Sequence, residues 1–431
     1  VDSALAQAHA VAFRTPFQSN KEMRNAINAG EVQYYDVHLS QIGQDVRYGF
    51  LGDIDVAIVE ASDITEEGDI VLSTSVGISP TLIQVAHKVI IELNEAHASK
   101  LTGMHDIYIP DAPPYRREIP IYRVNDRAGS ISVRVNPEKV VGVVRTNERD
   151  RIAAFTPLND TTSRIGQNVA DFLLGEYQRG AIPREFLPLQ SGVGNIANAV
   201  LGALGADKKL PAFSMYTEVI QNSVIDLMMQ ERIRFVAGSS LTLSDDRLDM
   251  LYDNIDVMKE RVLLRPQEIT NHPEMIRRLG IIAVNTALEA DIFGNVNSTH
   301  VLGSKMMNGI GGSADFARNA YLSIFTTPST AKDGLISSIV PHVSHVDSTE
   351  HDVRILVTEQ GVADLRGKSP SQRARCIIEN CAHPDYKELL WDYLKLSEGK
   401  GCHTPMSLRN ALKMHIAFAE TGDMRNTKFE M

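Results

Sequence analysis

The sequence predicts an α/β protein with two domains. Short runs rich in β-branched residues, at 54–59, 88–93 and 139–144, alternate with longer stretches of helical or loop character, and this alternation is typical of α/β folds. The chain has 431 residues, of which 43% are apolar, whereas single domains usually contain about 100 to 200 residues. Two domains imply a cleft between them, and ligand sites are common in such clefts.

Residues 145–162 predict the boundary between the domains, because they are polar, charged and contain proline. An amphipathic segment at 169–177 follows them. We therefore expect an N-terminal domain at residues 1–150 and a C-terminal domain at residues 160–431.

The C-terminal half repeats the alternation of the first half. Residues 369–420 are expected to be helical, because their apolar positions recur at helical spacing. Further strands are expected at 234–237, 281–285 and 353–357.

Two segments, 60–73 and 289–298, resemble each other. Each has an acid after a strand, a turn with a glycine, and a short strand that ends in serine. This similarity indicates either an internal duplication or two unrelated hairpins that share common turn residues. Two related halves packed face to face would place a site at their interface.

Composition excludes several classes of partner. The net charge is −11 and no long cluster of Lys or Arg is present, which argues against nucleic acid or an anionic membrane as the main partner. The three cysteines form no CxxC pair, so we expect a reducing compartment, no disulfide framework and no zinc site at the cysteines. No apolar run approaches the roughly 18 residues that span a bilayer. We expect a cytoplasmic protein, or a mitochondrial one in a eukaryote.

Two glycine-rich loops are the strongest local signals. The first contains Gly192 and Gly194 and leads into a helical pattern, and the second has three glycines within residues 309–312. Backbone N–H groups in such loops can bind an anion or an oxyanion. Gly192, Gly194 and Ala197 also fit the dinucleotide fingerprint G-x-G-x-x-A, with Glu218 near the position of a ribose-binding acid. A glycine-shaped turn without a ligand is the third interpretation.

The acid in FSMYTEV, Glu218, follows a strand-like run. Apolar residues recur at helical spacing from Ile220 to Met228, which predicts a helix with Thr217 as its N-cap and Glu218 in its first turn. A helix dipole favours the ionised carboxylate there. Glu218 is therefore either a simple helix cap or a carboxylate kept ionised for nucleophilic chemistry.

Other candidate sites are weaker. Residues 341–352 are rich in His and Asp, but His342 and His345 would point to opposite faces of an extended chain, so we expect no metal. His105 and Asp106 are adjacent in sequence, and such neighbours rarely face each other. No serine nucleophile signature of the type GxSxG is present.

Four segments read in order, SGVGNIANAV, MYTEV, NGIGGSADFARNAY and TEQGVADLRG, resemble class I CoA-transferases of the acetyl-CoA hydrolase/transferase family. The similarity is closest to succinyl-CoA:acetate CoA-transferases and extends over essentially the whole chain, including GFLGDIDVAIVEAS and GMHDIY in the first half. The resemblance implies two related open α/β domains of the CoA-transferase type with the active site at their interface. Family members usually have a further glycine-rich strand-turn-helix segment ahead of this chain's start, so we expect the first domain to be incomplete.

The resemblance also implies roles for particular residues. It makes Glu218 the nucleophile, with Asn271 and Glu359 near the reacting carboxylate. The implied CoA contacts, which include the oxyanion donors of the two loops, are Gly192, Val193, Gly194, Asn195, Ile196, Asn308, Gly312 and Lys332; Lys332 is suited to a CoA phosphate.

The family chemistry would be ping-pong transfer of CoA from an acyl-CoA, such as succinyl-CoA or acetyl-CoA, to a small carboxylate such as acetate. Coenzyme A would be a substrate, with no tightly bound cofactor and no metal, and the enzyme would be a homodimer. The rival activities are acyl-CoA hydrolysis by the same glutamate and, from another class, dinucleotide-dependent oxidation. A non-catalytic binding protein fits least, because a full set of candidate groups is present.

Overall fold

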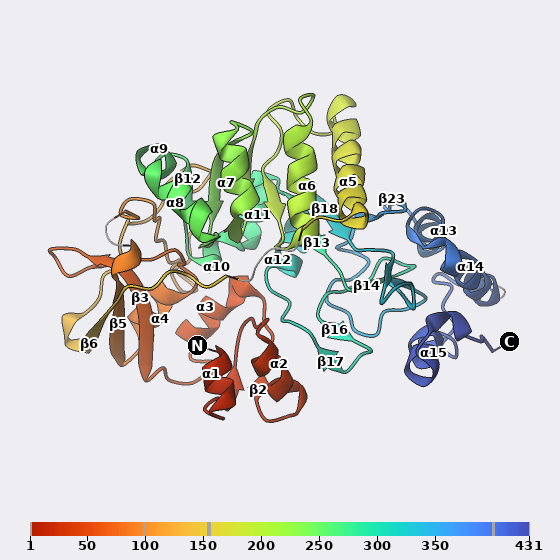
Figure 1. Ribbon diagram of the computed structural model, residues 1–431, viewed down its shortest axis with the longest axis horizontal. Helices are drawn as coiled ribbons and strands as arrows, with labels where there is room; N and C mark the ends of the chain where they lie inside the picture. The colour runs from red at the N-terminus through yellow and green to blue at the C-terminus, as the bar shows by residue number, and fades with distance from the viewer. Residues whose placement is uncertain (1, 98–99, 153–156, 399–400, 431) are drawn as a thin grey trace.

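The computed structural model describes all residues except 1, 98–99, 153–156, 399–400 and 431 (Figure 1). It contains an eight-stranded sheet built from residues 189–364 and a four-stranded sheet built from residues 56–146. The predicted α/β class is confirmed.

The eight-stranded sheet is parallel except at one edge, where the last two strands are antiparallel. Several of its strands are buried along their whole length, which is why they read as continuous apolar runs rather than as an alternation. In spatial order the strands are β12 (Val262–Leu264), β10 (Ile233–Gly238), β8 (Phe213–Tyr216), β7 (Leu189–Ser191), β13 (Ile282–Thr286), β18 (Leu322–Thr326), β22 (Ile355–Thr358) and β23 (Gly361–Asp364).

Helices cover both faces of this sheet. One face packs against α5 (Asp160–Gln178), α6 (Asn195–Ala206) and α7 (Asn222–Met229), which stand side by side in Figure 1. The other face packs against α11 (Pro273–Leu279) and α12 (Ser313–Asn319). All three strands expected in this half are present, as parts of β10, β13 and β22.

The four-stranded sheet has the order β4 (Ile70–Leu72), β3 (Val56–Ile64), β5 (Lys88–Asn94) and β6 (Val140–Thr146). Its inner face joins the same hydrophobic core as the large sheet, through residues such as Val59 and Ile91. On its outer face Ile58 is 68% exposed. The domain boundary expected between residues 150 and 160 stays a prediction.

The remaining elements surround the two sheets. The two segments that resemble each other form antiparallel hairpins, one of β3 and β4 and the other of β14 (Glu289–Asp291) and β15 (Val296–Asn297). The expected helical region 369–420 contains three separate helices, α13 (Pro370–Cys381), α14 (Pro384–Glu398) and α15 (Lys413–Thr421).

The other helices are α1 (Asp2–Gln7), α2 (Lys21–Asn28), α3 (Leu39–Arg47), α4 (Ser79–Val85), α8 (Asp245–Asp253), α9 (Ile255–Lys259), α10 (Gln267–Thr270) and the 3₁₀ turns η1 (Glu95–His97), η2 (Pro137–Lys139) and η3 (Met424–Asn426). The short strands are β1 (Phe13–Arg14), β2 (Gln33–Tyr34), β9 (Val219–Gln221), β11 (Ser240–Thr242), β14 (Glu289–Asp291), β15 (Val296–Asn297), β16 (His300–Val301), β17 (Lys305–Met306), β19 (Thr330–Ala331), β20 (Ile336–Ser337) and β21 (Ile339–Val340).

One predicted element is wrong. Glu218 lies in a bend between β8 and β9, and the helix that follows, α7, begins at Asn222. The apolar pattern from Ile220 onward looked helical because Ile220, a buried residue of β9, happens to be in helical register with the apolar residues of α7. Thr217 is therefore no N-cap, because the N-cap of α7 is Gln221, and Glu218 does not lie in the first turn of this helix.

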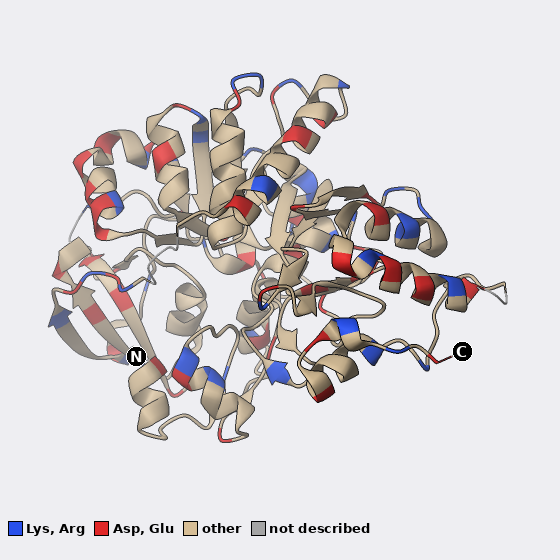
Figure 2. Ribbon diagram, turned by 45° about the vertical axis from the view of Figure 1, so that its right-hand side comes forward, with Lys and Arg blue, Asp and Glu red and all other residues tan. Residues whose placement is uncertain are grey.

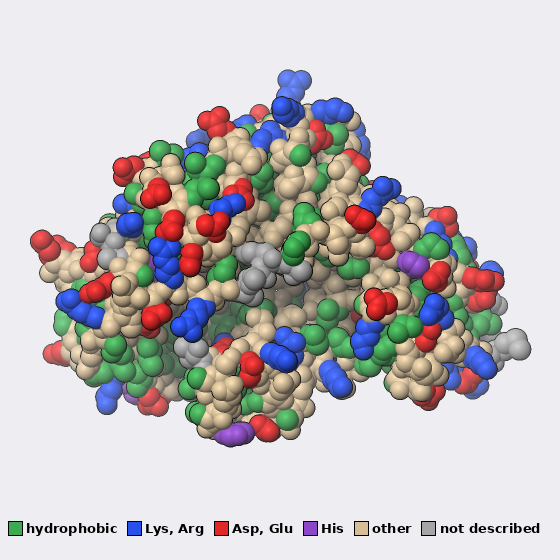
Figure 3. Space-filling model, in the orientation of Figure 1, with side chains coloured by type: hydrophobic (Ala, Val, Ile, Leu, Met, Phe, Trp, Pro, Cys, Tyr) green, Lys and Arg blue, Asp and Glu red, His purple; other side chains and the backbone are tan. Residues whose placement is uncertain are grey.

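Acidic and basic side chains are interspersed over most elements (Figure 2). Figure 3 shows one face of the molecule hollowed near its centre, between the N-terminal helices α1–α3 and the helices α5–α7. Among the described residues, no helix combines the length and apolar character needed to cross a lipid bilayer.

Candidate active site

Three candidate segments follow neighbouring or nearby strands of the eight-stranded sheet. Gly192 comes directly after β7, Glu218 lies two residues after β8, and Glu359 comes directly after β22. These strands run parallel, so their carboxyl ends meet at one edge of the sheet. In open α/β sheets this edge is where ligands bind.

The bend at Glu218 is held by backbone hydrogen bonds. Its carbonyl oxygen accepts from the N–H of Ser239 at 2.7 Å and from the N–H of Ser240 at 3.2 Å. On the other side, the N–H of Thr217 donates to the carbonyl of Ala237 at 2.9 Å. The backbone is therefore fixed, and the side chain is presented from a rigid support.

The Glu218 carboxylate has few hydrogen-bond donors for a group in this position. Asn271 Nδ2 donates to Oε2 over a long distance of 3.4 Å. Burial raises the pKa of Glu218 to about 7; the Asn271 side chain and the Gly312 backbone amide oppose this rise, and the charge of Asp315 adds to it. The expectation that a helix dipole keeps this group ionised is therefore wrong. Near neutral pH the group exchanges a proton readily.

Gly312, the last glycine of the second loop, is in direct contact with this carboxylate. A methyl group added at Gly312 would overlap both Glu218 Oε2 and Asn271 Nδ2. Only glycine allows the loop backbone to approach so closely. The second loop, Glu218 and Asn271 thus form one cluster.

Asn271 is fully buried at the end of α10. Its Oδ1 accepts from the hydroxyl of Thr270 at 2.8 Å, which directs Nδ2 toward Glu218. The same helix is anchored by a bidentate ion pair in which the two terminal nitrogens of Arg47 each lie 2.7 Å from Glu268 oxygens. A residue of the N-terminal half therefore helps to position Asn271.

The first glycine loop lies beside the Glu218 bend. The Thr217 hydroxyl donates to the Ser191 carbonyl at 3.2 Å, and Gln221 Nε2 donates to the Gly192 carbonyl at 2.9 Å. Gly194 has a positive φ of 115° and is the N-cap of α6 without a side-chain cap. The first N–H groups of α6, which begins at Asn195, are thus available to an anion. Val193, between the two glycines, is 53% exposed.

The N-terminal half supports the second glycine loop, a contact that no sequence pattern predicted. Asp36 accepts from the N–H of Ile310 at 3.0 Å. Asp315 accepts from the Ser40 N–H at 3.0 Å and from its hydroxyl at 2.6 Å. Such contacts between distant segments carry no sequence pattern.

Glu359 is bound differently and does not contact Glu218. Its carboxylate accepts from the N–H of Ser329 at 2.8 Å, from the Ser329 hydroxyl, and from Gln360 Nε2 at 3.0 Å. Burial alone would raise the pKa of Glu359, but hydrogen bonds, led by the two from Ser329 and including one from Gln360, together outweigh it and lower that pKa.

The other predicted positions lie outside the cluster around Glu218. Asn308 Nδ2 donates to the carbonyl oxygens of Ser298 and Gly309. Lys332 is exposed in the turn of the β19–β20 hairpin, where its ammonium group lies 5.0 Å from the centre of the Phe418 ring. Ile196 is buried in the first turn of α6.

His105 and Asp106 bind separate partners, as their adjacency predicts. The Nε2 atom of His105 lies 3.1 Å from the Ser73 carbonyl, and Asp106 forms a buried ion pair with Arg265 at 3.2 Å. Burial lowers the pKa of His105 to about 4. In the segment 341–352, His345 pairs with Asp347 at 3.3 Å.

Comparison with known proteins identifies the family. The model of the acetyl-CoA hydrolase/transferase N-terminal domain matches residues 1–145, and that of the C-terminal domain matches residues 248–394. The chain belongs to the acetyl-CoA hydrolase/transferase family. This confirms the resemblance drawn from the sequence motifs, and it makes the protein an enzyme of the CoA-transferase and hydrolase type.

Relatives of both activities are similar over nearly the whole chain. A propanoyl-CoA:succinate CoA transferase of Escherichia coli is 50% identical over 98% of this chain and 86% of its own length. A succinyl-CoA:acetate CoA-transferase of Clostridium kluyveri is 49% identical over 99% of this chain and 79% of its own length. An acetyl-CoA hydrolase of Schizosaccharomyces pombe is 47% identical over 97% of this chain and 83% of its own length.

Solved structures agree on the fold. RipA from Yersinia pestis is similar with a TM-score of 0.68 at 22% identity, covering 91% of this chain and 89% of its own. A 4-hydroxybutyrate CoA-transferase from Porphyromonas gingivalis has a TM-score of 0.63 at 23% identity, covering 92% and 89%. The predicted CoA-transferase-type fold is confirmed.

Proposed function

We propose that this enzyme transfers CoA from an acyl-CoA, such as succinyl-CoA or acetyl-CoA, to a small carboxylate such as acetate, with Glu218 as the nucleophile. The observation that supports this most is the contact of the Glu218 carboxylate with Gly312 and Asn271. It places an activated acid between two glycine loops at the ligand-binding edge of the sheet.

The first half-reaction forms a covalent enzyme–CoA species. A Glu218 oxygen attacks the thioester carbonyl, the carbon–sulfur bond breaks, and an acyl-glutamyl anhydride and CoA thiolate result. The thiolate then attacks the glutamyl carbonyl of the anhydride, which releases the first carboxylate and leaves a glutamyl-CoA thioester.

The second half-reaction reverses these steps with a new acceptor. The incoming carboxylate attacks the glutamyl-CoA thioester, which forms a new anhydride and frees the thiolate again. The thiolate attacks the acyl carbonyl of this anhydride, so that a new acyl-CoA leaves and the Glu218 carboxylate is regenerated. One thioester replaces another, and no ATP or water is consumed.

Asn271 and Gly312 are suited to stabilise the charge that develops at Glu218. Whenever the glutamyl carbonyl is attacked, negative charge builds on its oxygen. Asn271 Nδ2 donates to Oε2, and the Gly312 backbone amide also lowers the pKa of this carboxylate. Donors placed before the reaction stabilise such an oxyanion without reorganisation.

The CoA contacts implied by the family resemblance remain part of the proposal. Residues 192–196, which form the first glycine loop and the start of α6, offer N–H groups to an oxyanion or to CoA. Asn308 lies four residues before Gly312 in the same loop. Lys332 would have to leave the Phe418 ring in order to reach a CoA phosphate.

The remaining features of this proposal depend on the family resemblance alone. CoA is a substrate rather than a tightly bound cofactor. The enzyme acts as a homodimer in the cytoplasm, or in the mitochondrion of a eukaryote. The domains divide between residues 150 and 160.

The dinucleotide interpretation loses its support. The strand, glycine loop and helix it requires are present as β7, Gly192–Gly194 and α6, and Glu218 follows the neighbouring strand. However, Gly312 and Asn271 occupy the space beside the Glu218 carboxylate, where a ribose would have to bind. The family membership favours CoA chemistry.

Hydrolysis is the second candidate, because acetyl-CoA hydrolases are among the similar relatives. A hydrolase would use the same glutamate and admit water to the anhydride or the thioester. Incubation with acetyl-CoA and succinate separates the two activities. A transferase forms succinyl-CoA and acetate, whereas a hydrolase frees CoA at the same rate with or without succinate.

The covalent species provides the decisive test. After incubation with acetyl-CoA, we expect mass spectrometry to find CoA bound to the peptide that carries Glu218, or a reduced side chain after borohydride treatment. No such adduct should form in Glu218→Gln. Failure to find an adduct, together with full activity of this variant, would falsify the mechanism.

A further inference from the structure

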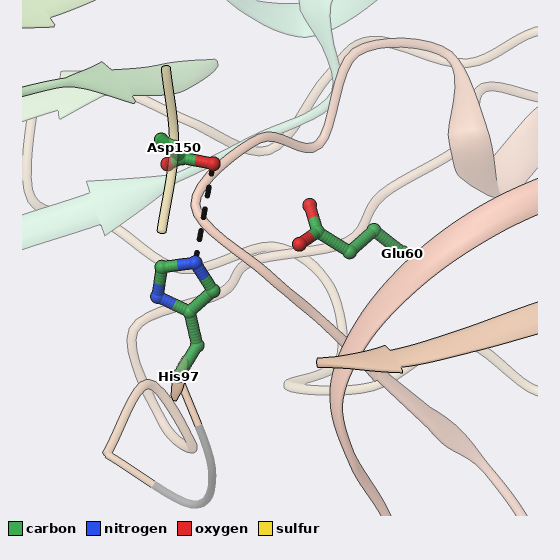
Figure 4. Close-up of side chains that lie close together, drawn as sticks. All are labelled: Glu60, His97 and Asp150. Atoms are coloured by element: carbon green, nitrogen blue, oxygen red, sulfur yellow. Dashed lines mark ion pairs between the residues drawn. The ribbon is translucent and has the colours of Figure 1, made fainter. Parts of the chain in front are cut away.

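We propose that a second site, separate from Glu218, binds one divalent transition-metal cation through Glu60, His97 and Asp150. Figure 4 shows the three side chains pointing toward a common centre. They come from β3, from η1 and from the segment that follows β6. Nothing in the proposed CoA transfer uses them.

The spacing of the three groups fits a cation. One ligand atom from each residue lies within 4.8 Å of the other two, and the Nε2 atom of His97 is 3.9 Å from Asp150 Oδ1. Imidazole and carboxylate ligands bind zinc at about 2.0 to 2.2 Å, so ligands of one zinc ion lie at most about 4.4 Å apart. The ligand atoms of the three residues would have to move closer together by less than about 1 Å in order to bind one zinc ion.

His97 supplies the observation that points to a ligand. Its side chain is fully buried, and among the described residues its Nε2 atom has no hydrogen-bond partner. A buried polar atom without a partner is costly and calls for an unseen ion or water. Nε2 faces the two carboxylates, which would supply the negative charge that a cation requires.

A second layer of hydrogen bonds holds each ligand in place. The Nδ1 atom of His97 lies 2.6 Å from the Tyr252 hydroxyl, and donation from Nδ1 leaves the lone pair of Nε2 free to bind a metal. Glu60 accepts from the Ser73 hydroxyl at 2.7 Å and from Asn94 Nδ2 at 2.6 Å. Orientation of ligands by such outer groups is typical of metal sites.

The ligand set selects the class of cation. One imidazole and two carboxylates suit zinc, manganese or iron better than magnesium or calcium, which prefer oxygen ligands alone. The three cysteines take no part in this site. The expectation that this chain binds no metal came from the cysteines, from residues 341–352 and from a transfer chemistry that needs no metal, and none of these involves Glu60, His97 or Asp150.

A cation at this site would stabilise the backbone that holds the bend at Glu218. Asp150 Oδ2 accepts from the Thr74 hydroxyl at 2.5 Å. The Thr74 carbonyl accepts from the N–H of Leu241 at 2.8 Å. The neighbouring Ser240 donates its N–H to the Glu218 carbonyl at 3.2 Å. A cation would therefore tie the N-terminal sheet to the bend at Glu218, as a positioning element and not as a reactant.

Calorimetric titration with zinc alone tests the proposal on the full chain after chelator treatment and dialysis. We expect one zinc ion per chain, with affinity weakened about 100-fold in His97→Asn and at least about 10-fold in Glu60→Gln, as for loss of a ligand. Zinc should also raise the melting temperature of the wild type and leave that of His97→Asn unchanged.

The controls separate this site from its rivals. The rings of His300 and His345 lie with centroids 3.9 Å apart, so these two imidazoles are the rival ligands to be tested. His345→Asn should therefore bind zinc as the wild type does. Glu148→Gln, an exposed acid near Asp150, should do the same. If His97→Asn fails to fold, Glu60→Gln decides the question.

Two results would overturn the proposal. One is the absence of zinc binding by the wild type at about 100 μM zinc, which would leave His97 as a simple partner of Asp150. The other is unchanged zinc binding in both His97→Asn and Glu60→Gln, which would place the cation elsewhere.

Discussion

Glu218 and Glu359 both follow strands at the carboxyl edge of the same sheet, yet their surroundings shift their pKa values in opposite directions. Glu218 has one long side-chain hydrogen bond, from Asn271, and burial raises its pKa to about 7. For Glu359 burial acts in the same direction, but hydrogen bonds, led by those from the hydroxyl and N–H of Ser329, together outweigh it and lower the pKa.

The comparison shows how donors decide the role of a buried acid. A carboxylate whose lone pairs are fully occupied by donors is stabilised and is a weak nucleophile. One with few donors keeps its lone pairs free to attack. This assigns the proposed attack to Glu218 and leaves Glu359 to hold Ser329, next to the β19–β20 hairpin.

Removal of the Glu218 carboxylate should have the largest effect. Glu218→Ala should lower kcat for CoA transfer by about 10³-fold or more, because no covalent intermediate can form. Transfer from acetyl-CoA to succinate measures this. Glu359→Gln is the matched control and should retain the covalent adduct. An adduct that disappears in Glu359→Gln and persists in Glu218→Ala would reverse the assignment.

Gly312→Ala should have the second-largest effect on CoA transfer. Its methyl group would overlap the carboxylate of Glu218 and the amide of Asn271, so both must move. We expect kcat to fall by about 10² to 10³-fold and the free energy of unfolding to fall by about 1 to 3 kcal/mol. Urea titration and transfer assays measure the two effects.

Gly202→Ala in α6 is the control for this substitution. An added methyl group there meets nothing within 4 Å, so helix propensity should make it neutral or slightly stabilising. Equal losses in the two variants would show that the approach of Gly312 to Glu218 does not matter.

Asn271→Ala should shift the pH dependence of activity. The free enzyme must be ionised at Glu218 in order to attack, so kcat/KM should fall as pH falls through about 7. Loss of the Asn271 donor removes an interaction that lowers this pKa. The acid limb of the profile should therefore move to higher pH, with kcat lowered by about 10 to 10²-fold. A limb that stays in place would mean that another group controls the profile.

Glu218→Gln should stabilise the fold above neutral pH. Below pH 4.5 the carboxyl is protonated in both the folded and unfolded states and affects stability little. Between pH 4.5 and about 7 the Glu218 carboxyl ionises in the unfolded state and stays protonated in the folded state. The free energy of unfolding therefore decreases over this range, and the decrease is complete above about pH 7. We expect a gain of about 1 to 3 kcal/mol at pH 8 and little change at pH 4.5. Equal gains at both values would contradict a raised pKa.

The sequence predicted the fold class, and its motifs named Glu218, Gly312 and Asn271, which the structure brings together. Apolar runs predicted three strands of the large sheet, β10, β13 and β22, because strands buried on both faces need no polar alternation. Local pattern failed at Glu218, where a strand residue, Ile220, fell in register with the helix that starts at Asn222. Contacts such as Ser40 with Asp315 join residues 275 positions apart, and only tertiary packing creates them.

Ser329→Ala should give the smallest effect and one of the opposite sign. The lowered pKa of Glu359 means that this acid stabilises the fold above the unfolded-state pKa of 4.5 and that this stability is lost as pH falls through the folded-state value. Loss of the Ser329 hydroxyl should remove about 1 to 2 kcal/mol at pH 7.5. Below the folded-state pKa of Glu359, where the acid is protonated in both states, the pH-dependent part of this loss should vanish.

Urea titrations at pH 7.5 and at a pH below the folded-state pKa of Glu359 measure how this loss of stability depends on pH. Ser163→Ala, at an exposed position of α5, should leave stability unchanged at both. A loss in Ser329→Ala that is independent of pH would show that Ser329 acts by packing and not through the Glu359 carboxylate.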